Sequence, residues 1–280
     1  MNLTQNVVEA YSKFIEFDNE SQSIDKFKDV LAYGMNLICE HLNMKFEYEI
    51  DTFGAIEFKT LISQYEPVSF AIKMYDATIF ENVQKCMTST LTKKRRAKLI
   101  TTESIKLLLS IYLEKYFEDV GNVAYSRNCL TIDAQGLFQF NANVYIFASN
   151  FSQNLLLEND TSRVLNVDFD KMKENFTTKK IETDYNYVRV VNVIKNLCEK
   201  SNLLQYSLLI ETLVYNVPNE YLKGNLRAQV IKSLNFIKFA NLSILNSLAN
   251  PKEKLEKDYF TIPSIYNVYK ELEILAKSLI

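Results

Sequence analysis

The apolar residues of this 280-residue chain change their spacing near residue 168, and that change limits the folds that the chain can adopt. Before this point short segments alternate apolar and polar residues, as in Phe46, Tyr48 and Ile50, which is the period of a half-buried strand. After it the apolar residues recur every three or four positions, the period of an amphipathic helix. The spacing therefore predicts an α+β fold with a mixed sheet in the first part and an all-helical second part.

Turn residues and helix-capping residues divide these two parts into elements. In the first part we expect an N-terminal helical cap over 6–43, two strands flanking a short helix within 44–75, helices over 77–91 and 101–117, strands over 123–132 and 137–147 joined by a hairpin at 133–136, and a short strand near 164–167. In the second part we expect helices over 187–200, 203–215, 221–248 and 262–279. No repeat or flexible linker interrupts the pattern. We therefore predict a mixed-sheet core with N-terminal helices over 1–167, packed directly on a helical domain over 168–280.

Composition excludes several classes of protein. Five Gly, four Pro and 48% hydrophobic residues are atypical of a disordered chain. The net charge of -2 provides no whole-molecule attraction to nucleic acid, so any such contact must be a local patch. The four cysteines are far apart and His41 is the only histidine, so no zinc-type spacing exists. The start of the chain reads as an amphipathic helix and no apolar run is long enough to span a bilayer, so we expect a cytoplasmic protein without a membrane partner.

Two consecutive helical stretches carry a resemblance to a known family. Residues 188–197 read VRVVNVIKNL and residues 206–218 read YSLLIETLVYNVP. They resemble the helical core of nucleotidyltransferases of the bacterial cyclic-oligonucleotide-synthase and oligoadenylate-synthase superfamily, in which a VRxxKN helix precedes an SxxIExLxYNVP helix. The resemblance implies a nucleotidyltransferase-like fold for the mixed-sheet core.

Within this resemblance, Lys195 and Ser207 match the positions that contact the nucleotide triphosphate in the family. A lysine offers three donors to phosphate oxygens and a serine adds a hydroxyl donor. We expect the Lys195 ammonium to face an open cleft, so that its removal reduces nucleotide affinity more than stability. The alternatives are a solvated helix face for Lys195 and a helix N-cap for Ser207.

The acidic residues that the family uses for catalysis do not appear in the matching strands. Members of the family hold two divalent ions with a carboxylate pair on one strand and a third carboxylate on a neighbouring strand. Here the corresponding strand reads EPVSFAIK over 66–73, and Asn143 stands where the third Asp is expected. Thr52, followed by an aromatic residue, stands where the family has a serine. We therefore assign Thr52 and Asn143 as nucleotide-binding candidates, leave the catalytic residues unassigned and expect magnesium only in an active enzyme.

Other charged groups leave two alternatives open. An unusual acidic site can be assembled from acids elsewhere in the first part, namely Glu49, Asp51, Glu66, Asp76 and Asp133. A basic cluster, Lys93, Lys94, Arg95 and Arg96 together with Lys98, is a candidate nucleic-acid-binding segment, and Tyr112, Tyr116 and Tyr125 follow it as stacking candidates. The alternative for the cluster is a solvated basic turn between two helices.

Three hypotheses about function follow. The first is a nucleotidyltransferase-like protein with weak or no catalysis that binds a nucleotide, an RNA or a partner protein, in phage defence or counter-defence. The second is an active magnesium-dependent enzyme that transfers a nucleotide from a nucleoside triphosphate to RNA, protein or another nucleotide. The third is a structural or interaction protein that retains the fold.

Overall fold

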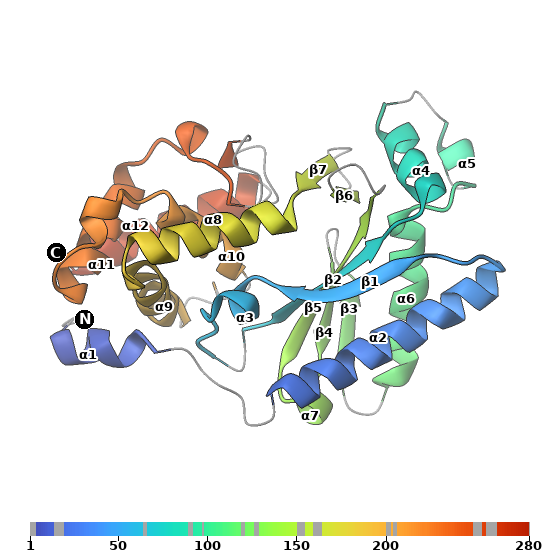
Figure 1. The fold of residues 1–280 in the computed structure, drawn as a ribbon, viewed down its shortest axis with the longest axis horizontal. Coiled ribbons are helices and arrows are strands. Elements are labelled where there is room, and N and C mark those ends of the chain that lie inside the picture. The colour runs from blue at the N-terminus through green and yellow to red at the C-terminus, as the bar shows by residue number, and fades with distance from the viewer. Residues whose placement is uncertain are drawn as a thin grey trace. The chain divides into compact units, whose positions relative to one another are not determined.

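The computed structural model shows the chain as two compact units (Figure 1). It describes residues 4–13, 20–63, 66–88, 92–96, 98–118, 121–125, 129–149, 155–158, 164–199, 203, 206–248, 254–255 and 262–279. The first unit, called the helical unit, comprises residues 1–15, 54–66 and 168–280; the second, called the sheet unit, comprises residues 16–53 and 67–167. The chain therefore passes between the units four times, at 15/16, 53/54, 66/67 and 167/168.

The sheet unit contains a mixed sheet, as the alternating apolar residues predict. Its elements are α2 Glu20–Leu42, β1 Tyr48–Phe53, β2 Val68–Met74, α4 Ala77–Thr88, α5 Lys93–Arg96, α6 Thr102–Tyr116, β3 Asn122–Tyr125, β4 Leu130–Asp133, α7 Gln135–Phe138, β5 Asn141–Ala148, β6 Leu155–Glu158 and β7 Val164–Val167. The strand order is β1-β2-β5-β4-β3, with β6 pairing with both β5 and β7. Strands β2 and β5 run parallel, whereas the other pairs are antiparallel. The parallel pair lies inside the sheet, and residues that are paired in its register lie directly beside each other.

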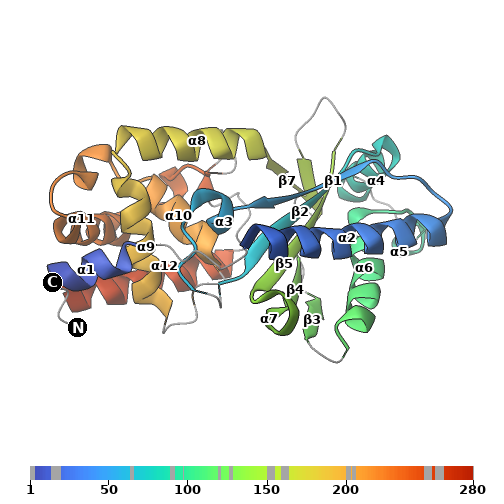
Figure 2. The same ribbon diagram turned by 60° about the horizontal axis from the view of Figure 1, so that its bottom comes forward.

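One face of this sheet is buried by aromatic packing. The ring of Phe27 on α2 lies 4.7 Å from that of Phe70 on β2 and 5.2 Å from that of Phe138 on α7, measured between centroids. Phe117, which follows α6, lies 6.3 Å from the same ring. Figure 2 shows α2 crossing the strands of this sheet. Since side chains alternate along a strand, the residues that flank Phe70 in sequence project from the opposite face.

Helices α2 and α6 approach each other closely at Gly34. A Cβ atom at this position would lie 2.6 Å from Cδ1 of Tyr112 and 2.9 Å from Cδ1 of Leu109, both on α6. Such distances are shorter than van der Waals contact. Glycine at position 34 therefore allows the two helices to pack at their present separation.

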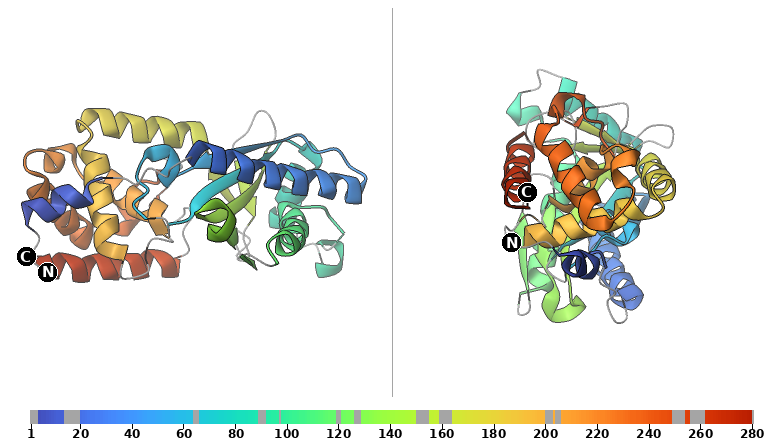
Figure 3. Two further views of the ribbon diagram at one scale, coloured as in Figure 1. Left: turned by 90° about the horizontal axis from the view of Figure 1, so that it is seen from below. Right: turned by 90° about the vertical axis from the view of Figure 1, so that its left-hand side faces the viewer.

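The helical unit is built almost entirely from helices. Its elements are α1 Gln5–Tyr11, α3 Ala55–Phe58, α8 Phe169–Glu182, α9 Asn186–Cys198, α10 Ser207–Tyr215, α11 Leu226–Phe239, α12 Ile262–Leu279 and the short 3-10 helices η3 Asn219–Leu222 and η4 Leu242–Ile244. Helix α8 begins where the spacing changes, because the Asp168 side chain accepts a hydrogen bond from the Lys171 amide at 2.8 Å. Figure 3 shows α1 beside α9, where Asn192 and Asn196 donate to backbone carbonyls at Ser12 and Tyr11.

The α+β fold and the helical second part are confirmed, and several element boundaries differ from the predictions. The strand predicted over 123–132 is two strands, β3 and β4, which pair antiparallel; residues 126–128 lie outside the described residues. The predicted 133–136 hairpin loop leads into helix α7. The helix predicted over 221–248 starts only at Leu226, because Gly224 has a φ of 92° and Asn225 caps α11. Within the described residues, no helix combines the length and the apolar character needed to cross a bilayer.

Candidate functional site

Lys195 lies at the centre of a fully buried charged cluster in the helical unit. Its ammonium is 2.6 Å from Glu211 Oε1 and 2.9 Å from Glu66 Oε1, and all three side chains have 0% exposure. The same nitrogen donates to the carbonyl oxygen and the hydroxyl of Thr60, at 3.0 and 3.1 Å. The Thr60 hydroxyl in turn donates to Glu211. We call this group of residues the Lys195 cluster.

Three separate segments bring the Lys195 cluster together. Lys195 is on α9, Glu211 is on α10, and Thr60 and Glu66 are in the 54–66 segment. Glu66 is held in place because its Oε2 accepts the Ile62 amide at 3.0 Å. The segment is attached to α8 by stacking of Phe58, whose ring centroid is 3.9 Å from that of Phe176. Because the sequence separation between these segments is large, helix periodicity alone cannot reveal the cluster.

The electrostatics of the cluster are unbalanced, with two carboxylates for one ammonium. Burial alone would lower the pKa of Lys195, but Glu211 and Glu66 outweigh it and raise that pKa, so the ammonium stays charged. Burial raises the pKa of Glu66, although the Lys195 ammonium acts in the opposite direction. Within the described part of the chain, Glu211 Oε2 is buried without a hydrogen-bond donor. The cluster therefore depends on its one ammonium.

The open cleft expected at Lys195 is not what the structure shows. With 0% exposure, the ammonium is enclosed by Glu66, Glu211 and Thr60, because buried acids supply the counter-charges that solvent or phosphate would otherwise supply. Ser207 is the first residue of α10 and Tyr206 is its N-cap, so Ser207 does not cap the helix. Its hydroxyl donates to Glu211 Oε1 at 3.3 Å. Contact of Lys195 and Ser207 with a nucleotide stays a prediction.

A row of neutral polar side chains crosses the sheet unit at Asn143. The register pairs Asn143 on β5 with Ser69 on β2 and with Thr131 on β4, and directly paired residues project from the same face. The Thr131 hydroxyl donates to Asn143 Oδ1 at 3.1 Å. Asn143 has an exposed fraction of 7%. The structure thus places Asn143 beside Ser69, on the strand where the family resemblance expects the carboxylate pair.

Thr52 is not on this face of the sheet. It pairs with Phe70, whereas its neighbour Phe53 pairs with Ser69. Strand alternation therefore directs Thr52 to the opposite face from Asn143. The structure does not bring these two candidate residues together.

The acids considered as an alternative site each have a structural partner. Asp51 and Glu49 form ion pairs with Lys73, at 2.6 and 3.5 Å, and Glu66 belongs to the Lys195 cluster. Asp76 accepts the amide of Thr78 at 2.8 Å and that of Ile79 at 3.1 Å at the start of α4. Asp133 accepts the Gln135 amide at 3.4 Å before α7. Glu49 and Asp51 therefore share Lys73, and among the described residues no three of these acids gather at one site.

A two-ion magnesium centre does not fit the residues at Asn143. Magnesium prefers carboxylate oxygens, whereas Ser69, Thr131 and Asn143 offer two hydroxyls and one amide, and the amide oxygen already accepts a hydrogen bond. The carboxylates of Glu49 and Asp51, on the same face, are paired with Lys73. In the part of the chain that the structure describes, no three His, Cys, Asp or Glu side chains gather as metal ligands.

Comparison with known proteins identifies the fold. Residues 174–256, which contain both Lys195 and Ser207, match the family model of the cGAS/DncV-like nucleotidyltransferase C-terminal helical domain. No curated protein sequence matches the chain. The CdnE cyclic dinucleotide synthase of Elizabethkingia meningoseptica, solved with GTP and Apcpp, superimposes with a TM-score of 0.66 at 16% identity, over 96% of this chain and 97% of that one. The chain has the cGAS/DncV-like nucleotidyltransferase fold.

Two further structures share this fold over nearly the whole chain. The Rhodothermus marinus CdnE c-UMP-AMP synthase with Apcpp and Upnpp gives a TM-score of 0.60 at 13% identity, covering 99% of this chain and 97% of that one. The CdnC:HORMA-deltaN complex of E. coli MS115-1 gives 0.60 at 10% identity, covering 99% and 91%. Both alignments extend well beyond the residues matched by the family model. The resemblance of the two helices therefore extends to the nucleotidyltransferase fold as a whole.

Inside this fold, sequence reasoning missed Glu211 and Thr60 as partners of Lys195. For Glu211 a signal was present, since it stands four residues after Ser207 on α10 and so shares a helix face with it. Thr60 carried no signal, because it is in a loop far from Lys195 in the sequence. Within the helical unit, the nucleotidyltransferase resemblance indicates only Lys195 and Ser207 as nucleotide contacts.

The basic cluster forms the short helix α5 in the sheet unit. Lys94 and Arg95 are exposed, whereas the side chains of Lys93 and Arg96 lie outside the described residues. Of the stacking candidates, Tyr112 and Tyr116 pack together on α6, with ring centroids 6.2 Å apart. The ring of Tyr125 lies under the Lys106 ammonium at 4.8 Å. Binding of nucleic acid by this segment stays a prediction.

Proposed function

We propose that the chain is a nucleotidyltransferase-like protein that binds a nucleoside triphosphate but transfers its nucleotide weakly or not at all. The observation that carries this proposal is the neutral row of Ser69, Thr131 and Asn143 on paired strands. Without carboxylates beside the phosphates, metal ions cannot be held to activate a hydroxyl and to neutralise the leaving group. The fold that the chain shares with synthases solved with bound nucleotides supports the binding role.

The biological role belongs to the same proposal. A protein that binds without turnover can act by sequestering a nucleotide, or by contact with an RNA or a partner protein, in phage defence or counter-defence. A chain with this fold was solved in a complex with a HORMA protein, which supports a protein partner. The competing function is an active magnesium-dependent nucleotidyltransferase.

Two measurements on the full chain separate these functions. Labelled ATP, GTP, CTP and UTP are incubated with the protein and magnesium, and we expect no new labelled product. Calorimetric titration with ATP and GTP is repeated with and without magnesium, and we expect binding of at least one nucleotide with little change in affinity. Robust magnesium-dependent product that disappears in Glu66→Gln, Asp76→Asn or Asp133→Asn would establish the active enzyme instead. Absence of any nucleotide binding would leave the interaction role.

A further inference from the structure

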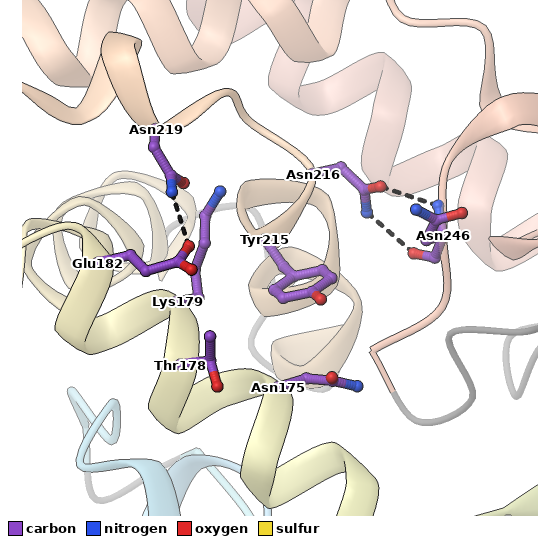
Figure 4. A pocket seen from close by; sticks show the side chains of 8 residues that line it. All are labelled: Asn175, Thr178, Lys179, Glu182, Tyr215, Asn216, Asn219 and Asn246. Atoms are coloured by element: carbon purple, nitrogen blue, oxygen red, sulfur yellow. Dashed lines mark hydrogen bonds between the residues drawn. The ribbon is translucent and has the colours of Figure 1, made fainter.

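A polar cavity of about 270 Å³ lies in the helical unit, away from the Lys195 cluster (Figure 4). Its lining residues come from α8, from the end of α10 and from the segments that follow: Asn175, Thr178, Lys179, Glu182, Tyr215, Asn216, Asn219 and Asn246. Ser207 begins α10 and Tyr215 ends it, so a rise of about 1.5 Å per residue puts roughly 12 Å between the two ends. The cavity is therefore separate from the candidate nucleotide-binding residues of the helical unit.

Lys179 is the buried charge at this cavity, with an exposed fraction of 9%. Its ammonium donates one hydrogen bond, to the Val217 carbonyl oxygen at 2.6 Å, and lies 5.8 Å from the centroid of the Tyr215 ring. Among the described residues no carboxylate forms an ion pair with it; the nearby Glu182 accepts instead from the Asn219 amide at 2.8 Å. Within the part of the chain that the structure describes, two of its three donors thus remain available. A buried ammonium without a paired anion is unfavourable unless a further group compensates it.

The wall of the cavity is fixed by hydrogen bonds within the protein. Asn216 donates to the carbonyl oxygens of Thr212 and Asn246, at 2.8 and 2.9 Å, and accepts the Asn246 amide at 2.8 Å. Figure 4 shows the two bonds between Asn216 and Asn246 and the bond from Asn219 to Glu182, and it places the Lys179 side chain between Glu182 and Tyr215. Side chains held in this way lose little further entropy when a ligand binds.

We propose that this cavity binds the oxyanion group, phosphate or carboxylate, of a small polar molecule, with the Lys179 ammonium as its counter-ion. Thr178 and Tyr215 also line the cavity, and each carries a hydroxyl group that can serve as an additional donor. Charge-assisted hydrogen bonds of this kind are stronger than neutral ones. The volume is below the 300 to 1,000 Å³ that is typical, roughly, of pockets for drug-sized ligands, so the ligand is smaller than a nucleotide. The carboxylate of Glu182, which also lines the cavity, favours a ligand of low total charge.

Protonation of Lys179 makes the proposed binding depend on pH. Burial lowers the pKa of Lys179 to about 8, while Glu182 on α8 and Glu220 on η3 act in the opposite direction. Tyr215 on α10 stays neutral, because burial raises its pKa. A bound anion stabilises the ammonium, so anion affinity should fall about tenfold between about pH 7 and pH 9 as the free lysine loses its proton.

The test is a titration of the full chain with sulfate and with acetate, in which NMR chemical shifts of the backbone amides monitor binding. Sulfate represents a phosphate group and acetate a carboxylate, and neither titrates between about pH 7 and pH 9. We expect saturable one-to-one binding of at least one anion, and the anion that binds identifies the group. The affinity should fall at least tenfold in Lys179→Met and should be unchanged in Lys180→Met, the neighbouring lysine outside the cavity.

Two results would overturn the proposal. One is the absence of saturable binding of either anion at millimolar concentration, and the other is equal binding by Lys179→Met and the wild type. If Lys179→Met fails to fold, the wild-type titration decides, because a site on Lys179 must lose affinity as the pH rises through the lowered pKa of that lysine. A wild-type affinity that is constant between about pH 7 and pH 9 assigns the binding elsewhere.

Discussion

Lys195 should be the most stability-sensitive polar residue of the Lys195 cluster, because it alone neutralises two buried carboxylates. Replacing it by methionine keeps the side-chain volume but leaves Glu66 and Glu211 buried without a cation. Breaking a buried pair in this way costs about 3 to 5 kcal/mol. We expect Lys195→Met to lower the free energy of unfolding by that amount in urea denaturation.

The control for this prediction neutralises the partners at the same time. The triple variant Lys195→Met, Glu66→Gln, Glu211→Gln has no buried charge in the cluster and should recover much of the loss. Lys277→Met removes an exposed partner of Glu273 in the same unit and should leave the unfolding midpoint almost unchanged. A single variant as stable as the wild type would contradict the burial of Lys195.

The burial of Glu66 leads us to predict a specific pH dependence of the unfolding free energy. Burial raises its pKa in the folded protein, so the folded state holds the proton more tightly than the unfolded state does. The contribution of Glu66 is therefore fully present below the unfolded pKa of about 4.3 and is lost as pH rises through the raised folded value. The unfolding free energy of Glu66→Gln minus that of the wild type should increase with pH above about 4. A flat or falling difference would show that burial does not dominate at Glu66.

At the scale of single residues, the sequence indicated which polar residues take part in a polar cluster better than it indicated whether they are buried. Lys195 and Ser207 stood out because periodicity did not explain them, and both belong to one polar cluster. Their burial could not be predicted, because Glu66 is in a segment far from α9 and no periodic pattern links the two. Thr52 illustrates a different limit, since a shift of one position along a strand changes the face on which a side chain lies.

The contact between α2 and α6 depends on Gly34. Alanine normally favours a helix over glycine by about 1 kcal/mol, but its Cβ would lie 2.6 Å from the Tyr112 ring. Overpacking of this kind costs about 1 to 3 kcal/mol. We expect Gly34→Ala to lower the thermal midpoint, and to do so less in a Tyr112→Ala background. If Gly34→Ala raises the midpoint, the helices can separate without cost.

The parallel pairing of β2 and β5 predicts where a magnesium site can be introduced. Ser69→Asp with Asn143→Asp would place two carboxylates on paired positions of one face. Their repulsion should destabilise the protein, and magnesium should raise its thermal midpoint by binding between them. The matched control, Thr52→Asp with Asn143→Asp, puts the carboxylates on opposite faces and should show no such response. A similar magnesium effect in both variants would contradict the assigned faces.

At the scale of elements, the sequence predicted whether a segment is a helix or a strand more reliably than it predicted where that element begins and ends. The helix predicted over 262–279 coincides with α12, because its apolar spacing is unbroken. The prediction of a single strand over 123–132 was wrong, since the sequence between β3 and β4 contains no Gly or Pro to indicate that the strand is interrupted. Gly224 and Asn225 did mark the start of α11, but the apolar residues around them concealed the signal.

At the scale of the whole molecule, the helical unit includes residues from outside 168–280. We therefore predict that residues 168–280 do not form a stable domain alone. A fragment of these residues lacks Glu66 and Thr60, so Lys195 and Glu211 would lose partners. It also lacks the α1 segment, whose carbonyls accept from Asn192 and Asn196. We expect no cooperative urea transition for the fragment, in contrast to the full chain. A cooperative transition with native-like near-UV circular dichroism would show that the first two segments are dispensable.

The four passages between the units also set an order for folding during synthesis. The 54–66 segment leaves the ribosome long before α9 and α10, which supply Lys195 and Glu211. At about 5 to 20 residues per second, the delay is on the order of ten seconds. During that interval Glu66 and Thr60 lack their partners on α9 and α10, Lys195 and Glu211, while residues 67–167 of the sheet unit emerge. The 54–66 segment of the nascent chain therefore stays without its final contacts until α9 and α10 are made. Slower translation beyond residue 168 would prolong the exposure of this segment to proteases and chaperones.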